Sequence, residues 1–251
     1  LEQRFGGWSA MGGTGSFVKG MTGLIEGLDG KIECNAEVEE ILVDQGAVRG
    51  VRLADGRTLH SDLVVSNADA AWTYRHLIKA EHRKRWTDRK LDRSHFSNGL
   101  FVWYFGTEGK YPGVPHHSVI LGPRYKGLLD DIFKRKVLAD DFSLYLHRPT
   151  ETDPSLAPEG CDTFYALAPV PHLDADVDWP TYAETFKERI CQRLEDTMLP
   201  GLRSRIVTSR LLTPQDFQGS PEKVTRGTRG KASPLLAGPP RSTSTRSGPR
   251  A

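Results

Sequence analysis

Cysteine is scarce in this sequence of 251 residues, which holds only Cys34, Cys161 and Cys191 and no CxxC pair. A disulfide framework or a thiolate zinc site needs regular cysteine spacing, so we interpret the three as reduced thiols. No apolar run approaches the roughly 18–20 residues that cross a bilayer. The opening residues, LEQRFGGWSA, have no basic segment or cleavage site, so we do not expect them to be a signal peptide. They also lack an initiator methionine, so we expect Leu1 to lie within a longer chain.

Charge is almost balanced overall, with a net value of +2, but it is unevenly distributed. Residues 219–251 carry seven Lys or Arg and one acid, while residues 1–218 carry 27 basic and 31 acidic residues. The C-terminal stretch also contains no aromatic residue, and 19 of its 33 residues are Gly, Pro, Ser or Thr. Such a composition buries too little apolar surface to offset its ordering entropy, so we predict that residues 219–251 are disordered.

The glycine-rich stretch GGTGSFVKGM, residues 12–21, poses the question of a nucleotide-binding loop. Such a loop follows a buried strand, has GxGxxG spacing and is followed about 20 residues later by an acid at a strand end. Here no strand-like run precedes the glycines, and Val18 stands at the third glycine position. We therefore predict a glycine turn that starts a helix, with Thr14 or Ser16 as N-cap and Gly30 as stop. Its apolar stripe has helical spacing and comprises Phe17, Met21, Leu24, Ile25 and Leu28.

Strand patterns dominate most of the remaining sequence. The turn tripeptides DQG and ADG divide residues 31–60 into a short strand and a hairpin meander, and residues 63–66 read as a further strand. Four aromatic and β-branched strands are predicted at residues 96–106, 116–122, 142–149 and 162–173, with a helix at 125–133. A second long helix is indicated by Tyr182, Phe186, Ile190, Leu194 and Met198. The pattern predicts a mixed α+β or α/β fold.

A charged connector, residues 71–92, contains a basic run from Arg83 to Lys90. Basic clusters are a feature of nucleic-acid-binding proteins. Acids are interleaved here (Glu81, Asp88 and Asp92), and no recognised nucleic-acid motif is present. We interpret the run as a solvated helix face and expect no nucleic-acid partner.

Several long segments, in order, resemble one enzyme family. These are GGTGSFVKGMTGLIEGLDGKI, SNGLFVWYFG, HHSVILGPRYKGLLDDIF, DFSLYLHRPTETDPSLAPEGCDTFYALAPVPHL and MLPGLRSRIVTSRLLTPQDF. Together they resemble the bacterial phytoene desaturases, a carotenoid-pathway branch of the FAD-dependent amine-oxidase-like oxidoreductases. The resemblance runs from residue 1 to about Phe217 and is carried by many segments rather than by one short motif.

The resemblance implies a two-domain α/β (mixed α+β) fold, of which this chain holds incomplete parts. Residues 1–75 are expected in a partial Rossmann-like FAD-binding domain, as a helix, a strand and a hairpin meander. Residues 76–205 would form a sheet-and-helix substrate domain, and residues 206–218 a strand returning toward the FAD domain. The family's GxGxxG loop and its C-terminal flavin-contacting segment are not found in the sequence. The abrupt change of composition after TPQDF is typical of translation out of frame, with a genuine disordered tail as the alternative.

The implied activity is FAD-dependent desaturation of phytoene, a C40 polyene precursor, in carotenoid biosynthesis. Flavins accept a hydride from carbon while a proton leaves to a base or to water. The implied partners are phytoene and other apolar C40 polyenes, with a quinone or oxygen as electron acceptor. We expect a cytoplasmic enzyme in peripheral contact with the inner membrane, and little or no activity from these 251 residues alone. A non-catalytic carotenoid-binding or interaction module, and a related carotene isomerase or desaturase, remain alternatives.

Four residues correspond to cofactor-contacting positions under this resemblance, and no catalytic residue is assigned. Val38 matches a strand position whose backbone meets the adenine, with a core valine as the alternative. Ser66, Asn67 and Ala68 match a strand end near the flavin, although Asn67 and Asp69 are also typical turn residues.

Histidines and aromatic residues are further candidates for functional positions. Adjacent strand residues point to opposite faces, so we expect His116 and His117 not to share a metal, and we predict no metal site. His147 and His172 are candidates for a proton relay, or ordinary strand-end histidines. The four aromatic residues of the strand at 96–106 should divide between the core and the wall of a polyene tunnel. They are Phe101, Trp103, Tyr104 and Phe105.

Overall fold

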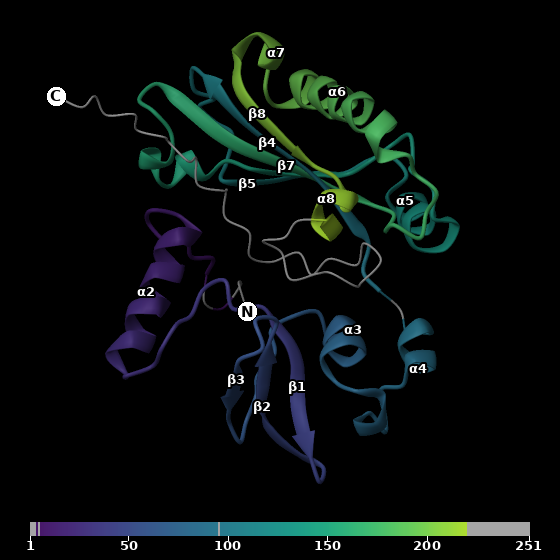
Figure 1. Ribbon diagram of the computed structural model, residues 1–251. Coiled ribbons are helices and arrows are strands. Elements are labelled where there is room, and N and C mark those ends of the chain that lie inside the picture. The colour runs from purple at the N-terminus through teal and green to yellow at the C-terminus, as the bar shows by residue number, and fades with distance from the viewer. Residues whose placement is uncertain (1–3, 5, 95, 220–251) are drawn as a thin grey trace, which may run out of the picture.

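The computed structural model describes residues 4, 6–94 and 96–219 and contains two antiparallel sheets with flanking helices (Figure 1). A three-stranded sheet has the order β1-β2-β3, and a five-stranded sheet has the order β5-β6-β7-β4-β8. The predicted mixed α+β class is therefore confirmed. Every strand pair in the described residues is antiparallel, so the parallel sheet of a Rossmann-like domain is not among them. The predicted disorder of residues 219–251 falls, beyond Gly219, outside the described residues.

Helix α2 (Thr14–Gly27) forms where the apolar spacing predicts it. Its N-cap is Gly13, with φ of 75° and no side-chain cap, so the prediction of Thr14 or Ser16 as N-cap is wrong. The helix ends at Leu28, followed by Asp29 in the left-handed conformation. None of its residues is buried, and its apolar stripe is exposed to solvent.

The predicted meander is present as β1 (Val38–Asp44), β2 (Ala47–Leu53) and β3 (Thr58–His60). Its two turns fall at DQG and ADG, where Gln45, Gly46 and Gly56 have positive φ. Residues 63–66 form no strand, and that prediction is wrong. None of the described strands pairs with this run, so no ladder forms there.

Short helical turns connect the two sheets. They are α3 (Ala70–Trp72), a π-helical turn (Thr73–Leu77), a 3₁₀ turn (Ala80–His82) and α4 (Asp88–Asp92). Asp69 caps α3 by accepting a 2.9 Å hydrogen bond from the Trp72 N–H, which is the turn-forming role considered for it.

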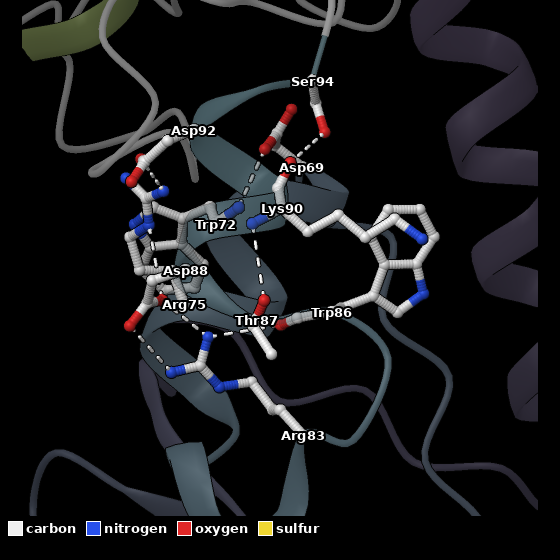
Figure 2. A network of polar contacts seen from close by, with 10 residues as sticks. All are labelled: Asp69, Trp72, Arg75, Arg83, Trp86, Thr87, Asp88, Lys90, Asp92 and Ser94. Carbon is white, nitrogen blue, oxygen red and sulfur yellow. Dashed lines mark hydrogen bonds and ion pairs between the residues drawn. The ribbon is translucent and has the colours of Figure 1, made fainter.

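Two arginines of this connector pair with acids, and one of them also donates to the Trp86 carbonyl (Figure 2). Arg83 lies 2.7 Å from Asp88, and Arg75 lies 2.6 Å from Asp92. The Lys90 ammonium stands 4.3 Å from the centre of the Trp86 ring, a cation–π contact. Most of the run is exposed to solvent, as interpreted, but only Asp88–Asp92 is helical. The interpretation as a helix face is therefore wrong for residues 83–87.

The five-stranded sheet contains the four strands predicted for this part of the chain, with a fifth at the edge. They are β4 (Gly99–Glu108), β5 (His117–Ile120), β6 (Leu144–His147), β7 (Cys161–Val170) and β8 (Ile206–Leu212). Strand β8 runs antiparallel to β4 and carries the chain back toward the start of that strand. Helix α8 (Pro214–Gly219) follows it.

Helix α6 (Trp179–Thr197) covers one face of this sheet, while the three-stranded sheet lies on the other side (Figure 1). Phe186, Ile190 and Leu194 of α6 are fully buried against the alternate residues of β4 and β7 that face them. This contact forms the main core of the protein. The remaining helical segments are α5 (Tyr125–Asp130) with a π-helical turn (Asp131–Arg135), two 3₁₀ turns (Pro149–Glu151 and Pro154–Leu156) and α7 (Leu202–Arg205). No helix in the described ranges has the length and hydropathy needed to cross a bilayer.

Candidate functional site

A pocket of about 320 Å³ lies beside the meander, between its strands and the start of the connector. Its volume is at the lower end of the 300–1,000 Å³ typical of small-molecule sites, enough for one ring system but not for a whole dinucleotide. The lining is mainly apolar, and besides Tyr74 it has two hydroxyl residues, Ser66 and Thr73, whose oxygens lie 2.9 Å apart. The other lining residues are Ile41, Val48, Val64, Ala68, Ala70, Tyr74 and Ile78.

Two of the four predicted cofactor-contacting residues line this pocket, Ser66 and Ala68. Asn67 is exposed between them and is not part of the lining. Val38 is the first residue of β1, opposite Leu53, and is also not part of the lining. The pocket therefore brings together the SNA segment and the strand that Val38 begins, but not all four residues.

The glycine turn before α2 is occupied by a carboxylate. The Gly12 N–H donates a 2.5 Å hydrogen bond to Asp153, which belongs to the loop before β7. An anion at this N–H would face a negative charge, so the turn is unsuited to hold a phosphate. This geometry supports the prediction that the glycines start a helix rather than grip a nucleotide.

The face of the five-stranded sheet away from α6 carries rows of side chains that strand pairing sets side by side. One row crosses the whole sheet, because each residue is the cross-strand partner of the next: Arg210, Tyr104, Tyr165, His147 and His117. The neighbouring row comprises Leu212, Val102, Leu167, Tyr145 and Val119. We call the two rows together the aromatic face.

The aromatic rings of β4 divide between the two sides of the sheet, as expected. Phe101, Trp103 and Phe105 are buried in the core under α6. Tyr104 alone points to the aromatic face, where its ring centre lies 5.6 Å from that of Tyr165. Tyr165 in turn lies 5.7 Å from Tyr145, so the rings form a continuous strip.

Burial controls the protonation of this strip. Desolvation raises the pKa of Tyr104, Tyr145 and Tyr165, so all three are neutral phenols at physiological pH. The Tyr165 hydroxyl, in addition, donates a hydrogen bond to Tyr145, which favours its neutral form further. The three phenols are therefore uncharged, and their rings form an aromatic strip suited to contact with an apolar molecule.

Three histidines meet at the β5 end of the aromatic face. The His116 and His117 ring centres lie 4.3 Å apart, and His147 lies 4.6 Å and 5.3 Å from them. The expectation that His116 and His117 point to opposite faces is therefore wrong. His116 lies just before the first residue of β5, where the strand alternation does not yet apply.

Burial is also the main cause of the low basicity of this cluster. Burial, with smaller contributions from the charges of His116 and His117, lowers the pKa of His147 to about 4. It likewise lowers the pKa of His116. Both imidazoles are therefore neutral at pH 7, with a lone pair on each ring. His172, the other predicted relay histidine, lies away from the cluster, where its Nδ1 accepts a 3.1 Å hydrogen bond from the Asp174 N–H.

A buried ion pair supports this end of the sheet. Arg148 and Asp162 form two hydrogen bonds of 3.0 and 3.3 Å, with side-chain exposures of 5% and 1%. Arg148 also donates to the Val114 carbonyl at 2.8 Å, and Thr150 donates to Asp162 at 2.8 Å. The network fixes the loops before β5 and after β6, and so the positions of the histidines.

Comparison with known proteins finds similar sequences over most of the chain. The chain is 50% identical over 223 residues to a neurosporene-forming phytoene desaturase of Cereibacter sphaeroides, covering 87% of this chain and 43% of the relative. It is 49% identical over 218 residues to a lycopene-forming phytoene desaturase of Pseudescherichia vulneris, covering 86% and 44%. The resemblance to bacterial phytoene desaturases is confirmed. A 4,4'-diapophytoene desaturase of a Methylomonas species is 32% identical, covering 90% and 44%.

The chain spans less than half the length of these relatives. No protein-family model matches it. Among solved structures, an oxidoreductase from Methanosarcina mazei has a TM-score of 0.58 at 22% identity, covering 84% of this chain and 45% of that one. A protein from Pyrococcus furiosus has a TM-score of 0.59 at 19% identity, with the same coverage. These two structures share the fold.

Sequence reasoning missed both the aromatic face and the histidine cluster as units. Each depends on strand order and register, because β5, β6, β7 and β4 are neighbours in an order that differs from the chain order. The sequence did offer one signal, because two of the predicted strands each have a histidine at one end, HHSVILG and FSLYLH. Pairing β5 with β6 would have placed His117 opposite His147.

Proposed function

We propose that this chain is part of an FAD-dependent oxidoreductase that desaturates phytoene in carotenoid biosynthesis. The observation that carries the proposal is identity of 45–50% to phytoene desaturases across about 87% of the chain. The two most similar relatives named above form different products, neurosporene and lycopene, at 50% and 49% identity. Similarity therefore supports the reaction class and leaves the number of desaturation steps open.

Within this proposal the chain divides as the sequence predicts. Residues 1–75 contribute α2 and the meander to the FAD-binding domain, and residues 76–205 form the substrate domain. Residues 206–218 carry the chain back toward the FAD domain. The three-stranded sheet is accompanied by an exposed helix, α2, whereas the five-stranded sheet packs against a buried core under α6. This difference supports a domain boundary near the connector.

We assign the pocket beside the meander to one part of the cofactor. Ser66 and Ala68 line it, and Asn67 lies between them, so this segment would approach the flavin side. The backbone of Val38 would meet the adenine. The mainly apolar lining suits a flat ring system, while the carboxylate at Gly12 argues that the phosphates bind elsewhere. When bound, FAD would supply the hydride acceptor, and a quinone or oxygen would reoxidise it.

The aromatic face is the surface that we assign to the polyene. Its tyrosines are neutral, and the second row is aliphatic apart from Tyr145. The one charged member, Arg210, is exposed on the edge strand β8, so a long hydrocarbon lying along the other residues would be desolvated without burying a charge. The chemical step itself would take place at the cofactor, and this chain's residues would orient the substrate and exclude water. An apolar substrate resides in membranes, which supports a cytoplasmic protein in peripheral contact with the inner membrane.

A segment exchange tests this function. Residues 1–217 of this chain replace the aligned segment of the neurosporene-forming relative, and the chimera is expressed in cells that accumulate phytoene. We expect a flavin-loaded protein and coloured polyenes, identified by their absorption spectra after chromatography. A folded, flavin-loaded chimera that leaves phytoene unchanged would contradict the proposal. If that chimera also retained bound carotenoid, the alternative of a non-catalytic carotenoid-binding module would be favoured.

Two substitutions in the chimera test the aromatic face. Tyr165→Asp places a charge in the middle of the face, and we expect product formation to fall at least tenfold with flavin content unchanged. Tyr182→Asp changes an exposed aromatic residue of α6 and serves as the matched control. Equal loss in both variants would remove the aromatic face from the proposal.

A further inference from the structure

We propose that His116, His117 and His147 form a binding site for one divalent transition-metal ion of the Zn²⁺ class, at the sheet edge made by β5 and β6. One ring nitrogen of each histidine lies within 4.8 Å of those of the other two. No other group of three His, Cys, Asp or Glu in the described part of the chain meets this spacing. The proposal reverses the sequence-based expectation of no metal site and is independent of the proposed desaturase function.

Backbone pairing sets the geometry of the cluster. His117 and His147 are direct partners across the β5–β6 ladder, and His116 precedes β5 by one residue. The Nε2 atoms of His116 and His147 lie 2.8 Å apart. Ligands of a tetrahedral ion with metal–nitrogen distances near 2.0–2.1 Å are about 3.3 Å apart, so small ring rotations would admit the ion.

The second ring nitrogens have the partners expected around a metal site. His116 Nδ1 lies 2.5 Å from the Thr152 hydroxyl, and His117 Nδ1 lies 2.6 Å from the Tyr145 hydroxyl. Such partners orient imidazole ligands, and here they leave both Nε2 atoms for the ion when Nδ1 carries the proton. The exception is His147, whose Nδ1 is buried without a hydrogen-bond partner. With Nε2 on the ion, this Nδ1 would carry the proton and would need a water as acceptor.

The surrounding structure holds the ligands in place. The Arg148 N–H donates a 2.9 Å hydrogen bond to the His116 carbonyl, and the Arg148 side chain is locked to Asp162. The cluster is therefore attached to one of the most rigidly bonded parts of the sheet, which reduces the entropy lost when the ligands are ordered around an ion.

Ligand chemistry selects the class of ion. Three imidazoles suit Zn²⁺, Cu²⁺, Ni²⁺ and Co²⁺, whereas Mg²⁺ and Ca²⁺ require oxygen ligands. His117 is exposed, so at least one coordination position would face solvent and hold water. The site would link β5 to β6, and it lies on a different sheet from the pocket lined by Ser66 and Ala68.

The test uses the tag-free 251-residue chain after treatment with a chelator. Zn²⁺ is titrated in competition with a chromophoric chelator, and Co²⁺ is titrated while its visible d–d absorption is recorded. We expect one ion per chain and a Co²⁺ band of low-symmetry, four- or five-coordinate type. His117→Ala, which changes an exposed side chain, should weaken Zn²⁺ binding at least tenfold and abolish the Co²⁺ band.

His60→Ala is the matched control, because His60 is also an exposed strand histidine but lies on the other sheet. We expect this variant to bind both ions as the parent chain does. Circular dichroism of each variant confirms that it is folded. Equal Zn²⁺ affinity of the parent chain and His117→Ala, or equal loss in His60→Ala, would overturn the proposal.

Discussion

Helices α2 and α6 are similar in sequence pattern and opposite in environment. Both repeat apolar residues at helical spacing, and both form as predicted. The stripe of α6 is buried under β4 and β7, while that of α2 has no buried residue. Periodicity therefore reports which face of a helix is apolar, and a partner surface decides whether that face stabilises the fold.

The two sheets differ in the same way. The five-stranded sheet holds a continuous core of aromatic and aliphatic residues, whereas the meander buries only Ile41 and Leu53 among its apolar residues. Glu40 of β1 makes a polar contact with Lys79 of the connector and pairs with Arg52 within the meander. We therefore expect substitutions in the two regions to have very different costs.

The largest contrast should come from one phenylalanine in each helix. Phe186 of α6 is 0% exposed, and its ring centre lies 4.9 Å from that of Phe101 and 5.0 Å from that of Phe142. Phe186→Ala should lower the free energy of unfolding by about 3–5 kcal/mol, because it removes buried contacts and leaves a cavity. Phe17 of α2 is 59% exposed, and Phe17→Ala should change stability by less than about 0.5 kcal/mol.

Urea unfolding followed by circular dichroism measures both variants. If Phe186→Ala does not fold, Phe186→Leu gives a milder loss of about 1–2 kcal/mol that keeps the contrast measurable. Similar losses in Phe17→Ala and the Phe186 variants would show that α2 packs against a surface in solution, and the comparison between the helices would fail.

The buried ion pair should give the next largest effect. Asp162→Ala removes the fully buried partner of the Arg148 guanidinium and leaves only Glu151, whose side chain is 49% exposed. Removing one partner of a buried pair costs about 3–5 kcal/mol. Asp140→Ala is the control, because Asp140 is fully exposed although it lies 3.5 Å from Arg189. The urea midpoint of Asp140→Ala should match that of the parent chain. If Asp140→Ala lost as much unfolding free energy as Asp162→Ala, burial of the ion pair would not be the cause of its stabilising effect.

The sequence was sufficient for most elements but not for their contacts. Aromatic and β-branched alternation located β4, β5, β6 and β7, and the DQG and ADG tripeptides located both hairpin turns. Alternation along one strand also separated Tyr104 from its three core neighbours. What it could not provide is the strand order, because the pairing of β6 with β7 and of β4 with β8 depends on contacts far apart in the chain.

Site prediction had the same limit. The resemblance predicts Ser66, Asn67 and Ala68 beside the flavin, and the structure shows that Ser66 and Ala68 line a pocket. The histidine cluster was not predicted, because the alternation of regular strands was applied to it. That rule fails at His116, which lies outside the ladder. The apolar run at residues 63–66 shows the converse error, since strand propensity without a pairing partner formed no strand.

A smaller effect is expected for flavin binding by this chain alone. The pocket beside the meander has room for one ring system, and the glycine turn that could have held phosphate is occupied by Asp153. We therefore expect purified 251-residue protein mixed with FAD to retain well under one flavin per chain after gel filtration, judged by absorbance near 450 nm. A stoichiometric yellow protein would show that the meander region forms a complete site.

The smallest effect should come from the polar attachment of the meander. Glu40 is buried, and its carboxylate lies 2.8 Å from the Lys79 ammonium and also pairs with Arg52. The hydrogen bond from Lys79, with the charge of Arg52, holds the pKa of Glu40 below its usual value. Glu40→Gln should therefore cost about 1–2 kcal/mol of unfolding free energy at pH 7, as expected for a charged hydrogen bond.

The pH dependence gives this last prediction its sign. A carboxyl whose pKa is lowered by folding stabilises the folded state above its unfolded pKa of about 4.3, and the contribution is lost as the pH falls through the lower, folded value. The difference between the parent chain and Glu40→Gln should thus be complete at pH 7 and shrink below about pH 4. Glu39→Gln, at an exposed position 3.6 Å from the same Arg52, should show little difference at any pH. A Glu40→Gln difference that is unchanged at low pH would mean that packing, rather than charge, attaches the meander to the connector.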